Sequence, residues 1–340
     1  MKRLTVAGRL IITALIIGAL FVGYKYFGGE KALNQMAEDR AQNPETEASN
    51  ASETEATPSE STPENSEATT SDNSAFTYTP PAPVDGKLKG VVELGASGFN
   101  SFIIKVDDQK RWALEKSEFG NSLVTENMAT DEDIRIGLKK YIGGMLDFGV
   151  SSKDIHFVVS SGAAKADVTP KITRVLKSIG YVVNQVTAEQ EGQLALRSVL
   201  PAEYANKAFV VDIGSGNTKM SWMEGTKVSA LESYGAKYYQ EGSDDSKVYE
   251  EVSSKAKQVP ADKRKTCFII GGVPFEMAKE VRKGKERFTT LSEPLAYSKL
   301  TNAKSKAGVN IYKAVKDATG CDQFVFDWDA NFTIGFLLGL

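Results

Sequence analysis

The sequence predicts an α/β fold built from two similar halves, and three observations support this prediction. An apolar, β-branched run that ends in a carboxylate and a Gly/Ser turn occurs at 91–98 and again at 210–218. From Lys87 onward, strand-like and helix-like patterns alternate. Both halves also repeat the order of three strands, a helix, a strand and a helix. These observations indicate a duplicated domain, with a first lobe at 87–205 and a second lobe at 206–340.

The first lobe is expected to open with a meander of three strands and to continue with alternating helices and strands. Thr130 and Asp133 have the spacing of a capping box at the start of its first helix. Gly180 is placed to end the second helix. The expected elements are strands at 90–94, 101–106 and 111–115, a helix at 130–148, a strand at 155–160, a helix at 169–179, a strand at 181–186 and a helix at 188–200.

The second lobe repeats the meander and ends in an apolar helical tail that begins near Ala330. The other expected elements are strands at 208–213, 218–223 and 227–231, a helix at 245–256, a strand at 266–270, helices at 274–282 and 302–317, and a strand at 323–328.

The first 27 residues predict a transmembrane anchor at 1–27. Lys2, Arg3 and Arg9 precede an apolar run at 10–24, and the apolar residues before Arg9 bring its length toward the ~20 residues of a spanning helix. A cleaved signal peptide has an apolar region of similar size, but large side chains occupy the positions where cleavage needs small ones. Because the basic residues lie before the helix, we expect a cytoplasmic amino terminus and an extracytoplasmic globular part.

A disordered acidic linker is expected at 28–86. Between Arg40 and Lys87 the chain has no Lys or Arg and is rich in Glu, Ser, Thr and Pro. Such a composition buries too little apolar surface to offset the entropy cost of ordering the chain. The prolines at 80–83 should stiffen the end of this linker.

The composition excludes several classes of protein. The net charge of −3 argues against a nucleic-acid-binding surface, which would be strongly basic. Two cysteines and the single His156 are too few for a zinc or iron–sulfur site. Cys267 lies in an apolar run and is expected in the core, and a disulfide between Cys267 and Cys321 stays open at this point.

The two carboxylate-ended turns suggest a phosphate site. A buried strand that carries an acid to its end, followed by a turn with exposed backbone N–H groups, can hold a metal-bound phosphate. The same pattern also occurs in plain hairpin turns, but its repetition in both halves favours a functional role. The expected contacts to phosphate from these turns are Ser97, Gly98, Gly214, Ser215, Gly216, Asn217 and Thr218.

A duplicated meander with an acid–glycine loop between its first two strands resembles the actin, hexokinase and chaperone-ATPase superfold, which implies a ribonuclease-H-like (actin-like ATPase) two-lobe fold. Within this superfold, the chain resembles the exopolyphosphatase and guanosine pentaphosphate phosphatase (Ppx/GppA) family over most of 88–280. Four segments carry this resemblance in the family's order. They are the phosphate loop at 211–218, a relaxed form at 160–167 of the family's Thr-Ser-Ala-x-Arg-x-Ala segment, the segment of the catalytic glutamate at 185–194 and the glycine pair at 270–272.

The resemblance implies a phosphohydrolase that acts on polyphosphate or a nucleotide phosphate. It places Glu191 at the position of the catalytic glutamate, which would orient or deprotonate a water molecule. Glu93 and Asp212 would hold Mg²⁺, directly or through water. The other implied phosphate contacts are Lys165, Gly271 and Gly272.

Each of these residues also has a simpler explanation. Glu191 lies near a helix start, where a carboxylate is favoured by the helix dipole, Lys165 would be a solvated surface charge, and the glycine pair would allow close packing. The chain also departs from the family pattern, because Glu93 replaces an aspartate, Lys165 an arginine and Asn217 a serine. An arginine-to-lysine change loses the planar fork that suits phosphate.

These departures motivate a second hypothesis, a membrane-anchored scaffold or sensor that binds a phosphate ligand and hydrolyses little. An actin-like filament protein is a third reading. A homodimer or an envelope protein partner is left open.

Overall fold

The computed structural model describes residues 76–95, 98–120 and 130–340. The expected membrane anchor at 1–27, most of the expected linker at 28–86, and Ser97 lie outside the described residues. Within these described ranges, no helix has the length and apolar character needed to span a membrane.

The described part of the first half forms a five-stranded sheet with three helices. Its strands are β1 (Lys87–Gly95), β2 (Gly98–Val106), β3 (Trp112–Phe119), β4 (Ile155–Val159) and β5 (Val183–Gln185), and its helices are α3 (Asp131–Asp147), α4 (Val168–Ser178) and α5 (Ala188–Val199). The strand order is β3-β2-β1-β4-β5. The predicted capping box at the start of α3 is confirmed, since Thr130 and Asp133 exchange both hydrogen bonds.

The described part of the second half forms a six-stranded sheet with four helices. Its strands are β6 (Ala208–Ile213), β7 (Asn217–Glu224), β8 (Lys227–Tyr234), β9 (Thr266–Gly271), β10 (Phe288–Thr290) and β11 (Gln323–Asp327), and its helices are α6 (Asp245–Ala256), α7 (Gly272–Val281), α8 (Ala303–Thr319) and α9 (Phe332–Leu338). The strand order is β10-β11-β9-β6-β7-β8. Strand β10 was not predicted from the sequence. Short 3₁₀ turns occur at Ser152–Asp154, Ala202–Tyr204, Tyr238–Glu241, Ala261–Lys263 and Pro294–Tyr297.

The two sheets share one central arrangement. Strands β1 and β6 each pair antiparallel with the next strand and parallel with a later one, β4 or β9. In this register Glu93 on β1 lies opposite Asn100 on β2, and Asp212 on β6 lies opposite Lys219 on β7. The predicted α/β fold with a duplicated sheet is therefore confirmed.

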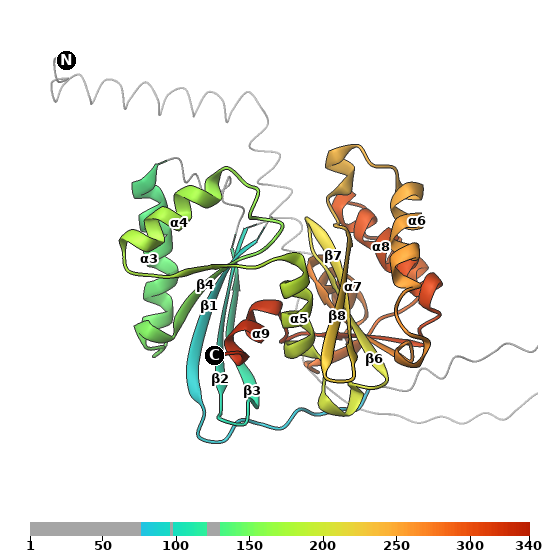
Figure 1. Ribbon diagram of the computed structural model, residues 1–340, viewed down its shortest axis with the longest axis horizontal. Helices are drawn as coiled ribbons and strands as arrows, with labels where there is room; N and C mark the ends of the chain where they lie inside the picture. Colours follow the sequence, from blue (N-terminus) through green and yellow to red (C-terminus); the bar gives the residue numbers. More distant parts are fainter. Residues whose placement is uncertain (1–75, 96–97, 121–129) are drawn as a thin grey trace, which may run out of the picture. The chain divides into compact units, whose positions relative to one another are not determined.

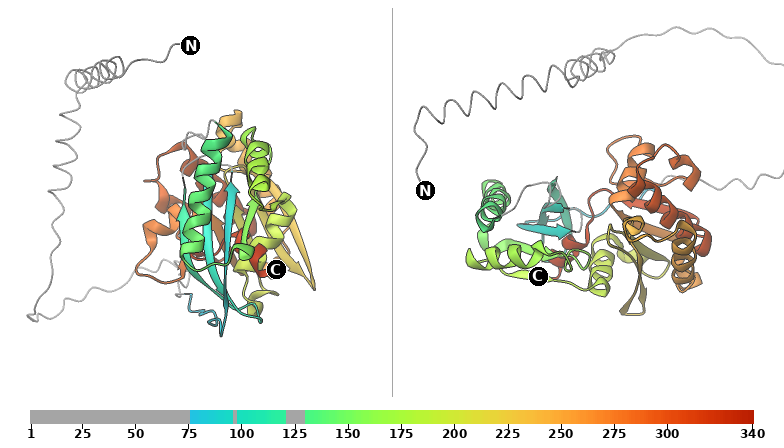
Figure 2. Two further views of the ribbon diagram at one scale, coloured as in Figure 1. Left: turned by 90° about the vertical axis from the view of Figure 1, so that its left-hand side faces the viewer. Right: turned by 90° about the horizontal axis from the view of Figure 1, so that it is seen from above.

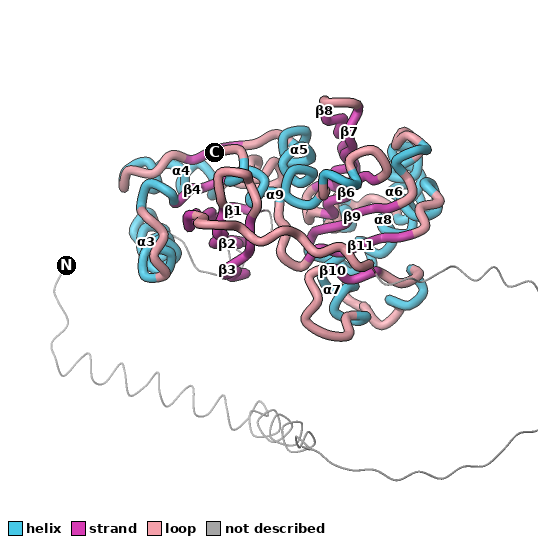
Figure 3. Tube along the Cα trace, turned by 90° about the horizontal axis from the view of Figure 1, so that it is seen from below, coloured by secondary structure: helices cyan, strands magenta, loops and turns pink. Residues whose placement is uncertain are grey.

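The last helix of each half packs across the boundary between the halves. Helix α5 lies against β6, β7 and β8 of the second sheet, whereas α9 lies against β1 and β2 of the first sheet and against α5 (Figure 1). Seen from below, α5 and α9 lie side by side between the two sheets (Figure 3). The backbones approach so closely that a Cβ atom on Gly335 would lie 1.9 Å from the carbonyl oxygen of Leu194. The two halves are thus joined by exchanged helices.

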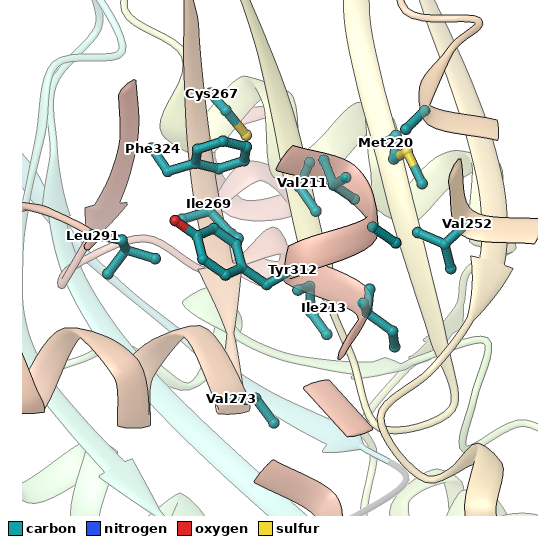
Figure 4. Packing of buried hydrophobic residues seen from close by; sticks show 14 of the residues in the cluster. Val211, Ile213, Met220, Val252, Cys267, Ile269, Val273, Leu291, Tyr312 and Phe324 are labelled. Carbon is teal, nitrogen blue, oxygen red and sulfur yellow. The ribbon is translucent and has the colours of Figure 1, made fainter. Parts of the chain in front are cut away.

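Buried apolar side chains form three clusters around this arrangement. One lies between the first sheet and helices α3 and α4, which cover that sheet in Figure 2, and another joins the second sheet to α6, α7 and α8. The third fills the space between the sheets and includes side chains of α5 and α9. Figure 4 shows part of the second cluster, in which Cys267 lies beside Phe324. Cys267 is buried as predicted, and both Cys267 and Cys321 are free thiols in the described chain.

The packed part of the chain begins before β1. The ring of Phe76 lies 5.5 Å from that of Phe268 and 5.2 Å from that of Phe288, measured between centroids. Tyr78 and Tyr204 belong to the same aromatic group. Residues 76–86, which we expected at the end of the linker, therefore include side chains packed against the cluster between the sheets.

Replacing Gly335 with alanine should destabilise the protein, because the new methyl group overlaps the Leu194 backbone. We expect a loss of about 1–3 kcal/mol in the free energy of unfolding, the range for overpacking, measured by urea denaturation of the full-length chain. Gly143→Ala in α3 is the matched control, because nothing lies within 4 Å of its Cβ position. It should stabilise the chain by up to about 1 kcal/mol through helix propensity. Equal effects of both substitutions would contradict the close approach of α9 to α5.

Candidate functional site

A cavity of about 260 Å³ lies where the two carboxylate-ended turns meet. The adjoining ends of β1 and β2, the β6–β7 turn and the start of α7 all contribute to its wall. The predicted site residues that line this cavity are Glu93, Gly98, Asp212, Gly214, Ser215, Gly216, Asn217, Gly271 and Gly272. The two acids that the sequence predicted to face each other therefore open into one cavity, from one half of the chain each.

Three predicted residues do not line the cavity described here. Glu191 is completely buried behind the wall. Thr218 is also fully buried, and its hydroxyl has no hydrogen-bond partner among the described residues. Lys165 is exposed, which agrees with its simpler explanation as a surface charge. Ser97 lies outside the described residues.

Glu93 is a buried carboxyl group held by two amides. Its Oε2 accepts hydrogen bonds from Nδ2 of Asn100 at 3.0 Å and from Nδ2 of Asn331 at 3.1 Å. Burial, together with the negative charge of Asp212, raises the pKa of Glu93 to about 7, although the two amide hydrogen bonds lower it. Asn331 precedes α9 and caps it, so the carboxyl-terminal helix delivers this contact to the first half. Glu93 therefore exchanges its proton near neutral pH.

Lys219 lies between two of the predicted acids, and the sequence analysis did not identify it. Its Nζ is ion-paired with Glu191 and lies 3.5 Å from Oδ2 of Asp212. Burial alone would lower the pKa of Lys219, but the charges of Asp212 and Glu191 outweigh burial and raise it. A buried, permanently charged ammonium group therefore neutralises the acidic cluster from within.

The predicted catalytic carboxylate is fully engaged. One oxygen of Glu191 accepts a hydrogen bond from the backbone N–H of Ser161, and the other faces Lys219. Burial raises the pKa of Glu191, whereas the charge and hydrogen bond of Lys219 lower it. Because both oxygens are held and the side chain has no exposed surface, Glu191 does not reach the cavity.

The donor set does not fit a Mg²⁺ ion held jointly by Glu93 and Asp212. A divalent cation bound by Asp212 would lie close to the ammonium group of Lys219, which repels it. One oxygen of Glu93 already accepts hydrogen bonds from the side-chain amides of Asn100 and Asn331. Among the described residues, no group of three or more His, Cys, Asp or Glu side chains is arranged to hold a metal ion.

The β6–β7 turn uses several of its polar groups internally. The backbone N–H of Gly214 donates to the carbonyl oxygen of Asn217, and the Asn217 amide donates to Oγ of Ser161 and to Oε1 of Glu232. In this structure the Gly214 N–H and the Asn217 side-chain amide thus already have partners within the chain, and a phosphate contact by these two residues stays a prediction. Asn217 links the two halves across the cavity wall.

Lys304 is a second cation at the cavity that sequence analysis did not identify. It lies in the first turn of α8 and lines the cavity beside Gly272, with Nζ 3.4 Å from the position a Cβ atom on Gly272 would take. Burial lowers the pKa of Lys304, opposed by the charge of Glu276. Gly271 has a φ of 114° and lies too close to the Ile213 backbone to carry a side chain. This glycine is therefore required for packing between β9 and β6, and it also lines the cavity.

The ionisation of Glu93 should make stability depend on pH. Its pKa is raised from 4.5 to about 7 on folding. The resulting stabilisation is therefore fully present below pH 4.5 and is lost as the pH rises through 7. Glu93→Gln stays neutral, so its stability relative to the wild type should increase by up to about 3 kcal/mol between pH 4.5 and pH 8.

Urea denaturation of both proteins at several pH values measures this difference. The exposed Glu118→Gln is the control for the amide substitution itself. A stability difference between Glu93→Gln and the wild type that does not change with pH would contradict the buried, partly protonated state of Glu93.

The comparisons with known proteins concern the fold. The sequence matches no protein-family model, and a search of curated proteins returns no match. Among solved structures, the Ppx/GppA family member of Aquifex aeolicus is 19% identical, with a TM-score of 0.56 over 74% of this chain and 97% of that one. An exopolyphosphatase from Cytophaga hutchinsonii is 15% identical, with a TM-score of 0.57 over 75% of this chain and 99% of that one. The expected resemblance is thus confirmed in structure, and the chain has the fold of the Ppx/GppA structures.

Proposed function

We propose that the cavity binds a phosphate-bearing ligand and that the protein acts as a sensor or scaffold rather than as an efficient hydrolase. The observation that carries this proposal is the position of Lys219, which engages Glu191 and neutralises the charge beside Asp212. The proposal corresponds to the second of the functions that the sequence suggested.

Several features of the cavity suit a phosphate group. Lys304 supplies a positive charge at one wall, and the first backbone N–H groups of α7 follow Gly271. The amino-terminal end of a helix attracts anions, because its N–H groups are not used within the helix and its dipole is positive there. Lys219 offsets the negative charge of Asp212, which would otherwise repel the ligand.

The contacts of Lys219 and Ser161 with Glu191 oppose hydrolysis. Cleavage of a phosphoanhydride needs a group that orients water in line with the bond and a cation that spreads the developing charge. Glu191 is held by Ser161 and Lys219 and does not line the cavity. The carboxylates do not fit a Mg²⁺ ion, because the ammonium group of Lys219 lies beside Asp212.

The competing function is a Mg²⁺-dependent phosphohydrolase that acts on polyphosphate or a nucleotide phosphate. The fold shared with an exopolyphosphatase structure and the position of Glu191 in the sequence favour it. It requires Lys219 to release Glu191 when substrate binds and Mg²⁺ to reach Glu93 and Asp212.

The cellular setting belongs to the proposal as well. The basic and apolar pattern at 1–27 supports a membrane anchor with a cytoplasmic amino terminus, and the acidic segment after it supports a tether to an extracytoplasmic domain. A sensor in that place would report a phosphate ligand to a second copy of the chain or to an envelope protein.

Lys304→Gln should weaken ligand binding, because it removes the cation beside Gly272. With inorganic pyrophosphate as the probe and no Mg²⁺, we expect the dissociation constant from calorimetry to rise about tenfold, or about 1.4 kcal/mol. Lys306→Gln is the matched control, because Lys306 lies two residues away on α8 and is exposed. Equal affinity in the wild type and Lys304→Gln would place the anion elsewhere.

The two functions differ in turnover. We expect the full-length chain to release orthophosphate from ATP or tripolyphosphate no faster than its Glu191→Gln variant, with or without Mg²⁺, because Glu191 does not reach the cavity. A malachite-green assay of released orthophosphate measures this. Mg²⁺-dependent release by the wild type would refute the sensor. Its loss in a Glu191→Gln variant whose circular dichroism spectrum matches that of the wild type would establish Glu191 as the residue responsible.

A further inference from the structure

Aromatic rings from both halves are among the residues that line the cavity. In the described part of the chain, the rings come from β2, β3, α7, β11, the residue that follows β11, and α9. They belong to Phe102, Phe119, Phe275, Phe326, Trp328 and Phe332. Apolar rings on this scale do not serve a purely inorganic anion, which needs cations and hydrogen-bond donors. None of these aromatic residues was predicted from the sequence to line a site.

The rings form a continuous surface across the two halves. The centroid of Phe119 lies 5.9 Å from that of Phe102 and 6.0 Å from that of Phe275. Phe275 in turn lies 5.3 Å from Trp328. These separations are within the range of favourable aromatic contacts. An apolar group that enters this part of the cavity would therefore contact rings from both halves.

Phe119 is the most informative member of this surface. Its side chain touches two other rings, yet the residue is 64% exposed. A phenylalanine whose only role is to hold the halves together would be buried, because burial supplies the stabilisation. An exposed ring at the edge of a cavity instead has a face available for a ligand.

Helix α7 carries both a proposed phosphate contact and one of the aromatic rings. Gly272 begins this helix beside Lys304, and Phe275 follows three residues later. Residues three apart lie on the same face of a helix, about 5–6 Å apart. A phosphate bound at the start of α7 would therefore carry its ester group to the ring of Phe275.

We propose that the ligand is a phosphate ester that carries one flat aromatic group, and not an inorganic polyphosphate. This inference rests on the proposed phosphate binding and names the class of ligand for the same site. The volume of about 260 Å³ is slightly below that of pockets for drug-sized molecules, which suits a single ring joined to a phosphate. The phosphate meets Lys304 and the start of α7, while the ring stacks against Phe275 and Phe119.

Two ligands with the same phosphate group distinguish binding of the phosphate from recognition of the aromatic ring. Methyl phosphate and phenyl phosphate present the same phosphate group, and only the second carries a ring. We expect the full-length chain to bind phenyl phosphate at least about tenfold more tightly in calorimetry, which corresponds to about 1.4 kcal/mol.

Equal affinities for the two esters would overturn the aromatic inference and leave the proposed phosphate binding intact. Binding of neither ester would overturn both.

A variant tests whether the rings supply the preference. Phe119→Ala should reduce the preference for phenyl phosphate to about threefold or less, while methyl phosphate binds as it does to the wild type. This substitution removes an exposed ring, so the fold should persist. Phe148→Ala is the matched control, because Phe148 is also exposed (39%) but does not line the cavity, and it should keep the full preference. A preference that survives Phe119→Ala unchanged would also overturn the inference.

Discussion

The buried ammonium group of Lys219 is the interaction on which the site depends. It lies on a strand of the second half, is ion-paired with Glu191 from a helix of the first half, and faces Asp212 on the neighbouring strand. Breaking a buried ion pair by removing one partner typically costs about 3–5 kcal/mol, because an uncompensated charge stays buried. The same contact therefore fixes α5 against the second sheet, keeps Glu191 out of the cavity and sets the charge around Asp212.

The exchanged helices explain why the cavity is built from both halves. Helix α5 of the first half packs on the second sheet, and α9 of the second half packs on the first. As a result, Glu191 meets Lys219, and Asn331 at the start of α9 donates to Glu93. Asn217 also donates a hydrogen bond to Ser161 across the boundary between the halves. Glu93 thus acquires its hydrogen bond from Asn331, and Glu191 its counter-charge, only when the two halves are assembled.

Most of the secondary structure followed from local patterns. The helix predicted at 245–256 is α6 with the same bounds, and the capping box of Thr130 marks the start of α3 as expected. Strand β10 was missed because its three residues carry no periodic signal and it forms by pairing with β11. The shared fold with the Ppx/GppA structures persists at 19% identity or less, since a fold requires the pattern of apolar residues more than particular polar ones. Chemistry is less tolerant, because it depends on single side chains.

The sequence by itself determined the duplicated α/β architecture and the two carboxylate-ended turns, because strand periodicity and turn residues are local properties of the chain. Only the tertiary structure decided what those acids meet. Lys219 looked like an ordinary strand residue, and it became the counter-ion of Glu191 because antiparallel pairing placed it opposite Asp212 while α5 packed above it. Lys304, Asn331 and the aromatic wall came from segments far apart in the chain. Such contacts depend on packing between elements, which no local pattern records.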